Sequence, residues 1–599
     1  MGSDTGAFFL AALLLSSLGP TQIIERSGTA DEAKRYKKTV RRRKDEHGVS
    51  GKHGVVTCEV DVCSNIGADI LKQGGSAADA IIAASLCVGS IDAFHSGQGG
   101  GGHLLVRSPN GTVEHIDFRE TLPAAGYPTI FKDHGANSSV VGGLAVGVPG
   151  EVRGFEALHK AYGKLPWFKL YKPSVKLNKA GFKVTNQLAT AIKEQKEYVC
   201  KGYFKESYCP GGKIAKEGQT IRRVRYGNAL AKIGSKGPSA FYHGPIARNT
   251  IRAINSTGGV MTLKDLAGYH VIHRQPVNAS LNGYHLYATA APSSGPVVLS
   301  SLQTLNQYDD REEAGYNLTT HRFIEATKFA YGERANYGDP AFVKNVSRLQ
   351  SEYLQVDYAK EKRHRIEDDG VLPKEAYDPS RFDILTDAGT SHLVAIDKHG
   401  LAVTMTTTVN TFFGSKVMTK DGIVLNNQMD DFSTPGVVNS YGYVPTVANY
   451  PAPGKRPLSS ISPLIAVDSH GKLVLATGSA GGSRIPTAVM IVTYGVLQDG
   501  LDIQSALNRP RWHDQLSPNA TYLEWAAPAD GITASQAVGS KEWHGFSNAT
   551  ASFLKGLGHN ITFTAPGSST AQGAQYFAKN GTFLGGAEVR QLAARPAAP

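Results

Sequence analysis

The run Asp387-Ala388-Gly389-Thr390-Ser391-His392-Leu393-Val394-Ala395-Ile396 lies about two thirds of the way along the chain. Residues alternate as in a strand over Ser391–Asp397, residues 398–400 (Lys-His-Gly) predict a turn, and 401–409 alternate again. The pattern therefore predicts a β-hairpin that opens just after Thr390. The glycine before this threonine can adopt backbone conformations that other residues rarely reach.

Three further motifs follow the hairpin in the chain. They are Asn426-Asn427-Gln428-Met429-Asp430-Asp431-Phe432, Pro457-Leu458-Ser459-Ser460 and Gly478-Ser479-Ala480-Gly481-Gly482-Ser483. Together with the Gly389-Thr390 run, these motifs resemble, in the same order, those of the γ-glutamyltransferase family, also called glutathione hydrolases. The resemblance covers roughly residues 53 to 595. In that family the chain cuts itself before a threonine, which becomes the N-terminal nucleophile of a small subunit.

The resemblance also implies the fold and the organisation of the chain. The fold would be α+β, a four-layer αββα sandwich of the N-terminal nucleophile hydrolase type; patterning alone supports only α+β or α/β. Residues 1–50 would form a signal or signal-anchor segment with a stalk, 51–389 a large subunit and 390–599 a small subunit. After self-cleavage the two subunits would pair as a heterodimer within one interwoven catalytic domain.

Thr390 is the predicted nucleophile. A threonine hydroxyl needs a base within hydrogen-bond reach, and a free N-terminal amine can serve. Thr390 gains that amine only if the Gly389–Thr390 bond breaks. Gly389 can take a strained backbone that lets the Thr390 hydroxyl reach its carbonyl, and the resulting ester would hydrolyse to free the amine.

The second strand of the hairpin carries two further candidates. Thr408 and Asn410 are two residues apart and share a face, which the hairpin can set beside Thr390. Threonines are also simply good strand formers. The resemblance implies that Thr408 hydrogen-bonds the nucleophile and that Asn410 contacts the amino-acid head of the substrate.

A second group of candidates would bind the glutamyl head. Gln428 and Asp431 offer the acceptors that an α-ammonium needs, since this cation has three donors. Arg119 offers a planar fork suited to the α-carboxylate. The resemblance adds two hydroxyl donors, Ser459 and Ser460.

Gly481 and Gly482 are the candidates for an oxyanion hole, because two successive backbone N–H groups can point at one developing negative oxygen. The glycine run 99–102 lacks the G-x-G-x-x-G spacing and the following helix of a nucleotide site. No H-E-x-x-H and no clustered Cys/His spacing predicts a metal site. The sequence therefore predicts neither a metal nor another cofactor.

The chain is basic, with a net charge of +12 over 599 residues. The charge is spread along the chain, and no RRM, zinc-finger or helix-turn-helix signature accompanies it, so nucleic-acid binding is not predicted. Hydrophobic residues make up 41% of the chain, which is ample for a buried core and argues against general disorder.

Two features predict an extracellular location. An apolar run over residues 7–18 suits the core of a signal peptide and is short for a membrane span. A basic stretch follows it over 34–44, opposite to the charge order of the type II anchor that the family usually carries; secretion and single-pass anchoring both stay open. Residues 41–44 are read as a solvated linker or a processing site. Ten Asn-x-Ser/Thr sequons favour the secretory pathway.

The five cysteines fit that compartment. Ser64 as a cap, Gly74-Gly75 as a stop and a Ser76–Asp79 capping box predict two antiparallel helices that bring Cys63 near Cys87. Cys200 and Cys209 enclose a short polar loop. Both pairs match disulfides that the resemblance implies, and Cys58 is predicted to be a buried free thiol.

The resemblance implies a self-processing γ-glutamyl hydrolase and transferase acting on glutathione and related compounds. Water, an amino acid or a dipeptide would take the glutamyl group from a threonine acyl-enzyme. Two alternatives stay open: an acylase for another amide, and a catalytically inactive secreted homologue that acts as a binding protein. The head-group set argues against the first, and the intact threonines and glycine pair argue against the second.

Overall fold

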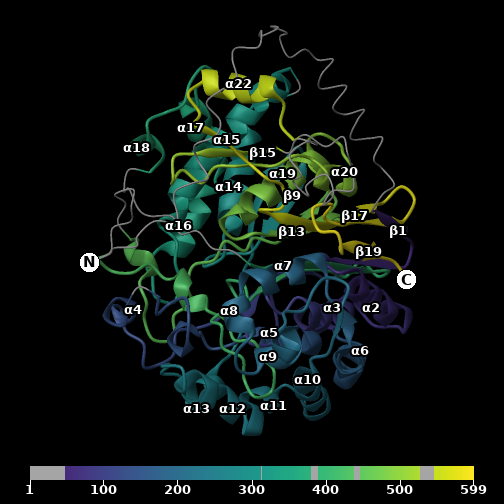
Figure 1. The fold of residues 1–599 in the computed structure, drawn as a ribbon. Coiled ribbons are helices and arrows are strands. Elements are labelled where there is room, and N and C mark those ends of the chain that lie inside the picture. Colours follow the sequence, from purple (N-terminus) through teal and green to yellow (C-terminus); the bar gives the residue numbers. More distant parts are fainter. Residues whose placement is uncertain (1–47, 136, 312, 379–388, 437–444, 526–544) are drawn as a thin grey trace, which may run out of the picture.

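Two antiparallel sheets of seven strands form the centre of the molecule in the computed structural model (Figure 1). The structure describes residues 48–135, 137–311, 313–378, 389–436, 445–525 and 545–599. The predicted targeting segment, apart from residues 48–50, and Asp387-Ala388 of the decisive run lie outside these residues. The first sheet has the order β1 (Val49–Gly51), β18 (Thr582–Gly586), β17 (Thr570–Phe577), β13 (Leu473–Ala480), β12 (Leu464–Val467), β9 (Tyr284–Ala288) and β8 (Val277–Leu281).

The second sheet carries the predicted hairpin at its middle. Its order is β19 (Arg595–Ala597), β2 (Gly54–Cys58), β10 (Ser391–Asp397), β11 (Ala402–Thr408), β3 (Gly101–Arg107), β4 (Val113–Asp117) and β7 (Ile272–Arg274). Two small sheets accompany the large ones: β14 (Trp512–His513), β15 (Thr521–Glu524) and β16 (Ile561–Thr564), and β5 (Phe182–Lys183) with β6 (Thr220–Ile221).

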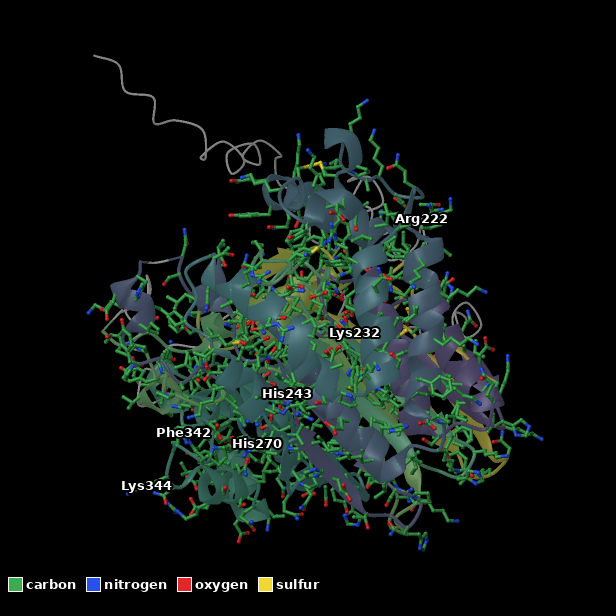
Figure 2. All side chains as sticks on the ribbon, turned by 90° about the horizontal axis from the view of Figure 1, so that it is seen from below. Arg222, Lys232, His243, His270, Phe342 and Lys344 are labelled. Carbon is green, nitrogen blue, oxygen red and sulfur yellow. A yellow bond between two sulfur atoms is a disulfide. The ribbon has the colours of Figure 1, made fainter. Side chains whose placement is uncertain are left out.

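Helices cover the outer face of each sheet, so that the four layers run helix, sheet, sheet, helix (Figure 1). The layer below comprises α2 (Asp61–Lys72), α3 (Ala77–Ile91), α4 (Ile130–Asp133), α5 (Glu151–Tyr162), α6 (Trp167–Ala180), α7 (Asn186–Glu194), α8 (Lys196–Val199), α9 (Phe204–Tyr208), α10 (Val224–Lys236), α11 (Ser239–Tyr242), α12 (Gly244–Asn255) and α13 (Leu263–Gly268). Exposed polar side chains such as Lys232 and His243 lie on the outer side of this layer (Figure 2).

The layer above comprises α14 (Gly295–Leu305), α15 (Gly315–Arg334), α16 (Val346–Tyr353), α17 (Val356–Arg365), α18 (Lys374–Tyr377), α19 (Ile485–Leu497), α20 (Ile503–Leu507) and α22 (Asn548–Gly556). Short 3₁₀ turns are η1 (Gly143–Ala145), η2 (Pro210–Gly212), η3 (Gln428–Asp431), η4 (Val447–Asn449) and η5 (Gly482–Arg484). Among the described residues, no helix has the length and apolar character needed to cross a bilayer.

The hairpin strands are buried on both faces, because they lie inside the sandwich. Leu393 and Ala395 pack into the core between the second sheet and the lower helices. Val394 and Ile396 pack into the core between the two sheets. The four-layer αββα fold expected from the sequence is confirmed.

The cysteine predictions are confirmed and one capping prediction is wrong. Cys63 is bonded to Cys87, Cys200 to Cys209, and Cys58 is a buried free thiol. Ser76 and Asp79 form the predicted capping box at the start of α3. Ser64, however, lies inside α2, which begins at Asp61; its hydroxyl instead accepts the Cys58 N–H at 3.2 Å, because the side chain faces the preceding strand.

Candidate active site

The Gly389–Thr390 junction lies directly before β10, at the centre of the second sheet. Gly389 has φ +105°, and a Cβ at this position would collide with the Asn410 carbonyl oxygen. Thr390 is only 5% exposed, and its hydroxyl donates a short hydrogen bond to the Gly389 carbonyl oxygen. The backbone at this junction therefore requires glycine, and it holds the hydroxyl against the carbonyl that precedes it.

Thr408 completes the surroundings of that carbonyl. The hairpin register pairs Ser391 with Thr407, so Thr408 lies across from Thr390. Its hydroxyl donates to the Gly389 oxygen at 2.8 Å, accepts the Asn410 N–H at 2.8 Å, and lies 3.5 Å from the Thr390 hydroxyl. The main contact of Thr408 is thus the carbonyl at the junction, and two hydroxyls polarise it.

A cavity of about 720 Å³ opens beside the junction. Gly389, Thr390 and Gly481 line the same cavity. β13 ends at Ala480, and Gly481 and Gly482 then take φ values of +125° and +59°. Within the described residues, no hydrogen bond uses the N–H of either glycine. Both N–H groups are therefore without a partner among the described residues, next to a cavity that Gly481 and Thr390 line.

The predicted head-group residues form a separate, buried cluster. Arg119 and Asp431 make a close ion pair, and the Gln428 Nε2 donates to the same carboxylate at 2.6 Å. Arg119 also donates to the carbonyls of Pro457 and Leu458, at 3.3 and 2.9 Å. The buried Gln428 Oε1 has no hydrogen-bond partner among the described residues. One acceptor is therefore open beside a paired carboxylate and guanidinium.

The remaining predicted residues border this cluster. Ser459 and Ser460 directly follow Leu458; Ser460 accepts a bond from Arg334 at 3.2 Å, and the Ser459 hydroxyl accepts the Ile461 N–H at 3.2 Å. Asn410 donates to the carbonyl of Asn427, the residue before Gln428, at 3.1 Å. Hydrogen bonds thus run from the Gly389 carbonyl through Thr408 and Asn410 toward the head-group cluster.

Only some of the predicted site residues line the cavity. Thr390 and Gly481 line the cavity, whereas Arg119, Gln428 and Asp431 lie outside its lining. Gly389 itself lines the cavity, and it is connected toward the cluster by the hydrogen bonds of Thr408 and Asn410.

Several cavity residues were missed from the sequence. Phe94, Phe412, Arg484, His513 and Tyr522 all line it. They come from distant parts of the chain, so only the run of glycines before Arg484 offered any signal. His513 lines the cavity while bonding Thr487 and Gln515, at 3.0 and 2.9 Å, and burial lowers its pKa to about 3.

Buried acids lie behind the hairpin. Burial raises the pKa of Glu120 to about 8, and both of its carboxyl oxygens lack partners among the described residues. Burial also raises the pKa of Glu151 to about 7, although the Thr407 hydroxyl donates to it. Both groups are therefore largely protonated at mildly acidic pH.

One set of possible metal ligands was also missed. His321, Glu325 and His559 come together in a buried cluster, although His559 is far from the others in sequence. The Lys328 ammonium lies 2.9 Å from the Glu325 carboxylate and 3.5 Å from His559. The Lys328 ammonium thus already balances the charge of the Glu325 carboxylate, and the two histidines bond each other at 2.8 Å.

Comparisons with known proteins identify the family of this chain. The profile described as Gamma-glutamyltranspeptidase matches residues 63–596. This chain belongs to the gamma-glutamyltranspeptidase family. It is 39% identical to the "Glutathione hydrolase proenzyme" of Arthroderma benhamiae, over 90% of this chain and 92% of that relative.

Solved structures show the same fold. A cephalosporin acylase from Bacillus halodurans aligns over 98% of this chain and 99% of its own, with a TM-score of 0.78 and 23% identity. The Helicobacter pylori gamma-glutamyltranspeptidase aligns over 52% of this chain and 91% of that chain, with a TM-score of 0.50 and 30% identity. The likeness to the acylase concerns the fold alone.

Proposed function

We propose that this chain is a self-processing γ-glutamyl hydrolase and transferase that acts on glutathione and related γ-glutamyl compounds. The observation that carries the proposal is the Gly389 carbonyl, which accepts hydrogen bonds from the Thr390 and Thr408 hydroxyls beside a cavity. Family membership supports it, and the relatives named as glutathione hydrolases suggest the substrate.

Self-cleavage begins when the Thr390 hydroxyl attacks the Gly389 carbonyl carbon. The Thr408 hydroxyl stabilises the negative oxygen that develops there. The proton of the hydroxyl passes to the peptide nitrogen, which leaves as the Thr390 amine, and an ester joins the Gly389 carbonyl to the Thr390 oxygen. Water then hydrolyses this ester, which leaves residues up to Gly389 as one subunit and residues from Thr390 as the other.

The freed amine then serves as the base for substrate. It takes the Thr390 hydroxyl proton as the oxygen attacks the γ-amide carbon, while Gly481 and Gly482 bind the oxyanion. The amine returns the proton to the leaving nitrogen, so cysteinylglycine departs from glutathione. Water, an amino acid or a dipeptide then takes the glutamyl group from Thr390.

The buried cluster would select the glutamyl head. The α-carboxylate would accept from Arg119 and the α-ammonium would donate to Asp431 and to the open Gln428 oxygen. Asn410, Ser459 and Ser460 border the same place. An acylase for another amide would have no use for this set of opposite charges.

Passage through the secretory pathway is part of the proposal. All ten sequon asparagines lie among the described residues; nine are exposed and Asn317 is half-buried. The two disulfides fit an oxidising compartment. The protein would be secreted or held by a single N-terminal anchor.

Intact-mass measurement tests the proposal. Wild-type protein should give two fragments, and Edman sequencing of the smaller one should begin Thr390-Ser391-His392. Thr390→Ala should remain one chain and should not hydrolyse a γ-glutamyl amide. Cleavage at another bond, or full processing of Thr390→Ala, would overturn the mechanism, and an uncleaved wild type would favour the inactive binding protein.

A further inference from the structure

Arg484 occupies an unusual position in the wall of the cavity. It ends η5, two residues after Gly482, and lines the cavity together with Thr390. Its guanidinium lies over the ring of Tyr522, 4.7 Å from the centroid. Such stacking holds a guanidinium in one orientation while leaving its N–H groups free to donate.

The charge of Arg484 is not matched by an acidic partner in the part of the chain that the structure describes. Among the described residues, its guanidinium makes no hydrogen bond and no ion pair. The carboxylate that acts on the pKa of Arg484 is that of Glu524, and it is bound to Arg590 at 2.6 Å. Burial lowers the pKa of Arg484, yet a guanidinium stays protonated at neutral pH. A charge that has lost part of its hydration therefore faces the cavity.

The rest of the cavity leaves this charge uncompensated. His513 is neutral, since its pKa is lowered to about 3 by burial and by Arg484 itself. Phe94 and Phe412 supply apolar surface, and the acidic Glu194 is exposed at the end of α7. A half-buried guanidinium fixed on an aromatic ring in such a cavity is suited to a planar anion.

We propose that Arg484 forms a carboxylate subsite for the peptide that leaves Thr390, and for a peptide acceptor that enters by the same route. This inference rests on the proposed function. In glutathione the leaving part ends in the glycine carboxylate, and a dipeptide spans about 7 Å when extended. Thr390 and Arg484 line one cavity, so the proposal places the leaving peptide in that cavity with its carboxylate at Arg484. The glutamyl head is read by other residues.

Three substrates with different leaving groups test whether Arg484 recognises the carboxylate of the leaving peptide. They are glutathione, glutathione with its glycine carboxylate converted to an amide, and a γ-glutamyl anilide that has no carboxylate on its leaving group. Wild type should favour the free acid over the amide by about 10-fold or more in kcat/KM, the effect of one charge-assisted hydrogen bond. Arg484→Gln should remove this preference, mainly through KM for glutathione.

Matched variants control for charge and for structure. Arg248→Gln removes the same charge from an exposed position of α12, which follows His243 (Figure 2), and should keep the wild-type preference. Arg484→Lys keeps the charge without the planar fork and should keep part of the preference.

The outcomes are distinguishable. An equal loss on all three substrates would show that Arg484 only supports the glycine turn, and the subsite would be rejected. Equal wild-type kcat/KM for the acid and the amide would also reject it, even if the Arg484 variants fail to fold. If wild-type protein hydrolyses none of the three substrates, the proposed function itself fails.

Discussion

The surroundings of the Gly389 carbonyl explain why self-cleavage is expected at this bond. A glycine is required there because any Cβ would strike the Asn410 carbonyl oxygen. Two hydroxyls, from Thr390 and Thr408, bond the same oxygen. One hydroxyl belongs to the attacking group, so the other must stabilise the charge that the attack creates.

Thr408→Val should therefore slow self-cleavage. Valine keeps the shape of threonine and removes the donor 2.8 Å from the Gly389 oxygen. We expect a rate lower by about 10²–10³, the usual effect of losing one oxyanion donor. Gel densitometry of freshly purified precursor over time measures this rate. Thr406 lies on the same face of β11, and its hydroxyl bonds His392 instead. Thr406→Val therefore serves as the control and should process normally.

Arg119 and Asp431 should respond differently to substitution although both would bind the glutamyl head. Arg119→Lys keeps a cation beside Asp431 but loses the planar fork, so KM for a γ-glutamyl amide should rise at least about 10-fold with normal self-cleavage. Asp431→Asn should raise KM as well and also lower the thermal midpoint, because it leaves the buried Arg119 charge unpaired. Wild-type KM in either variant would contradict the head-group assignment.

At the scale of elements, the sequence was most informative where a local signal sufficed. The hairpin, the Ser76–Asp79 capping box and the glycine stop of α2 follow from turn and capping chemistry. Ser64 was misassigned because a serine near a helix start resembles a cap, whereas its real partner is Cys58 in β2. Arg484 and His513 were missed for a related reason: only tertiary packing brings them to the cavity.

The capping box of α3 also contacts a segment that is distant in the sequence. The Asp79 carboxylate accepts the N–H groups of Ser76, Lys164 and Leu165, at 2.9, 2.9 and 3.0 Å. It thereby joins the start of α3 to the connection between α5 and α6.

Asp79→Ala should accordingly lower the thermal midpoint more than Ser76→Ala. The first variant leaves three donors without their acceptor, and hydrogen bonds to a charged group contribute about 1.5–3 kcal/mol each. The second removes one capping hydroxyl, which typically costs about 1 kcal/mol. Differential scanning fluorimetry ranks the two variants. Equal midpoints would show that the link to the α5–α6 connection contributes nothing.

At the scale of the whole molecule, two buried acids predict how stability depends on pH. The pKa values of Glu120 and Glu151 are raised by burial to about 8 and about 7, so the folded chain binds more protons than the unfolded chain at pH 5–7. Stability from these groups is therefore fully present below the ordinary carboxyl pKa and falls as pH rises toward 8.

Glu120→Gln should flatten this dependence. The neutral amide needs no proton, so relative to wild type the variant should gain about 1.4 kcal/mol for each pH unit between about 5 and 8. Thermal midpoints measured from pH 5 to 8.5 give the comparison. Parallel curves for the two proteins would show that Glu120 is ionised in the folded state.

Cleavage at Gly389–Thr390 should leave the two pieces firmly associated, because both sheets combine strands from each side of this bond. β10 pairs with β2, β11 with β3, and β12 with β9. All five cysteines precede residue 390, so no disulfide can join the pieces. Processed protein should elute from a size-exclusion column as one species, yet separate into two bands in SDS without reductant. Loss of either piece on the column would contradict the shared sheets, and a single band in SDS would show that the bond was never cut.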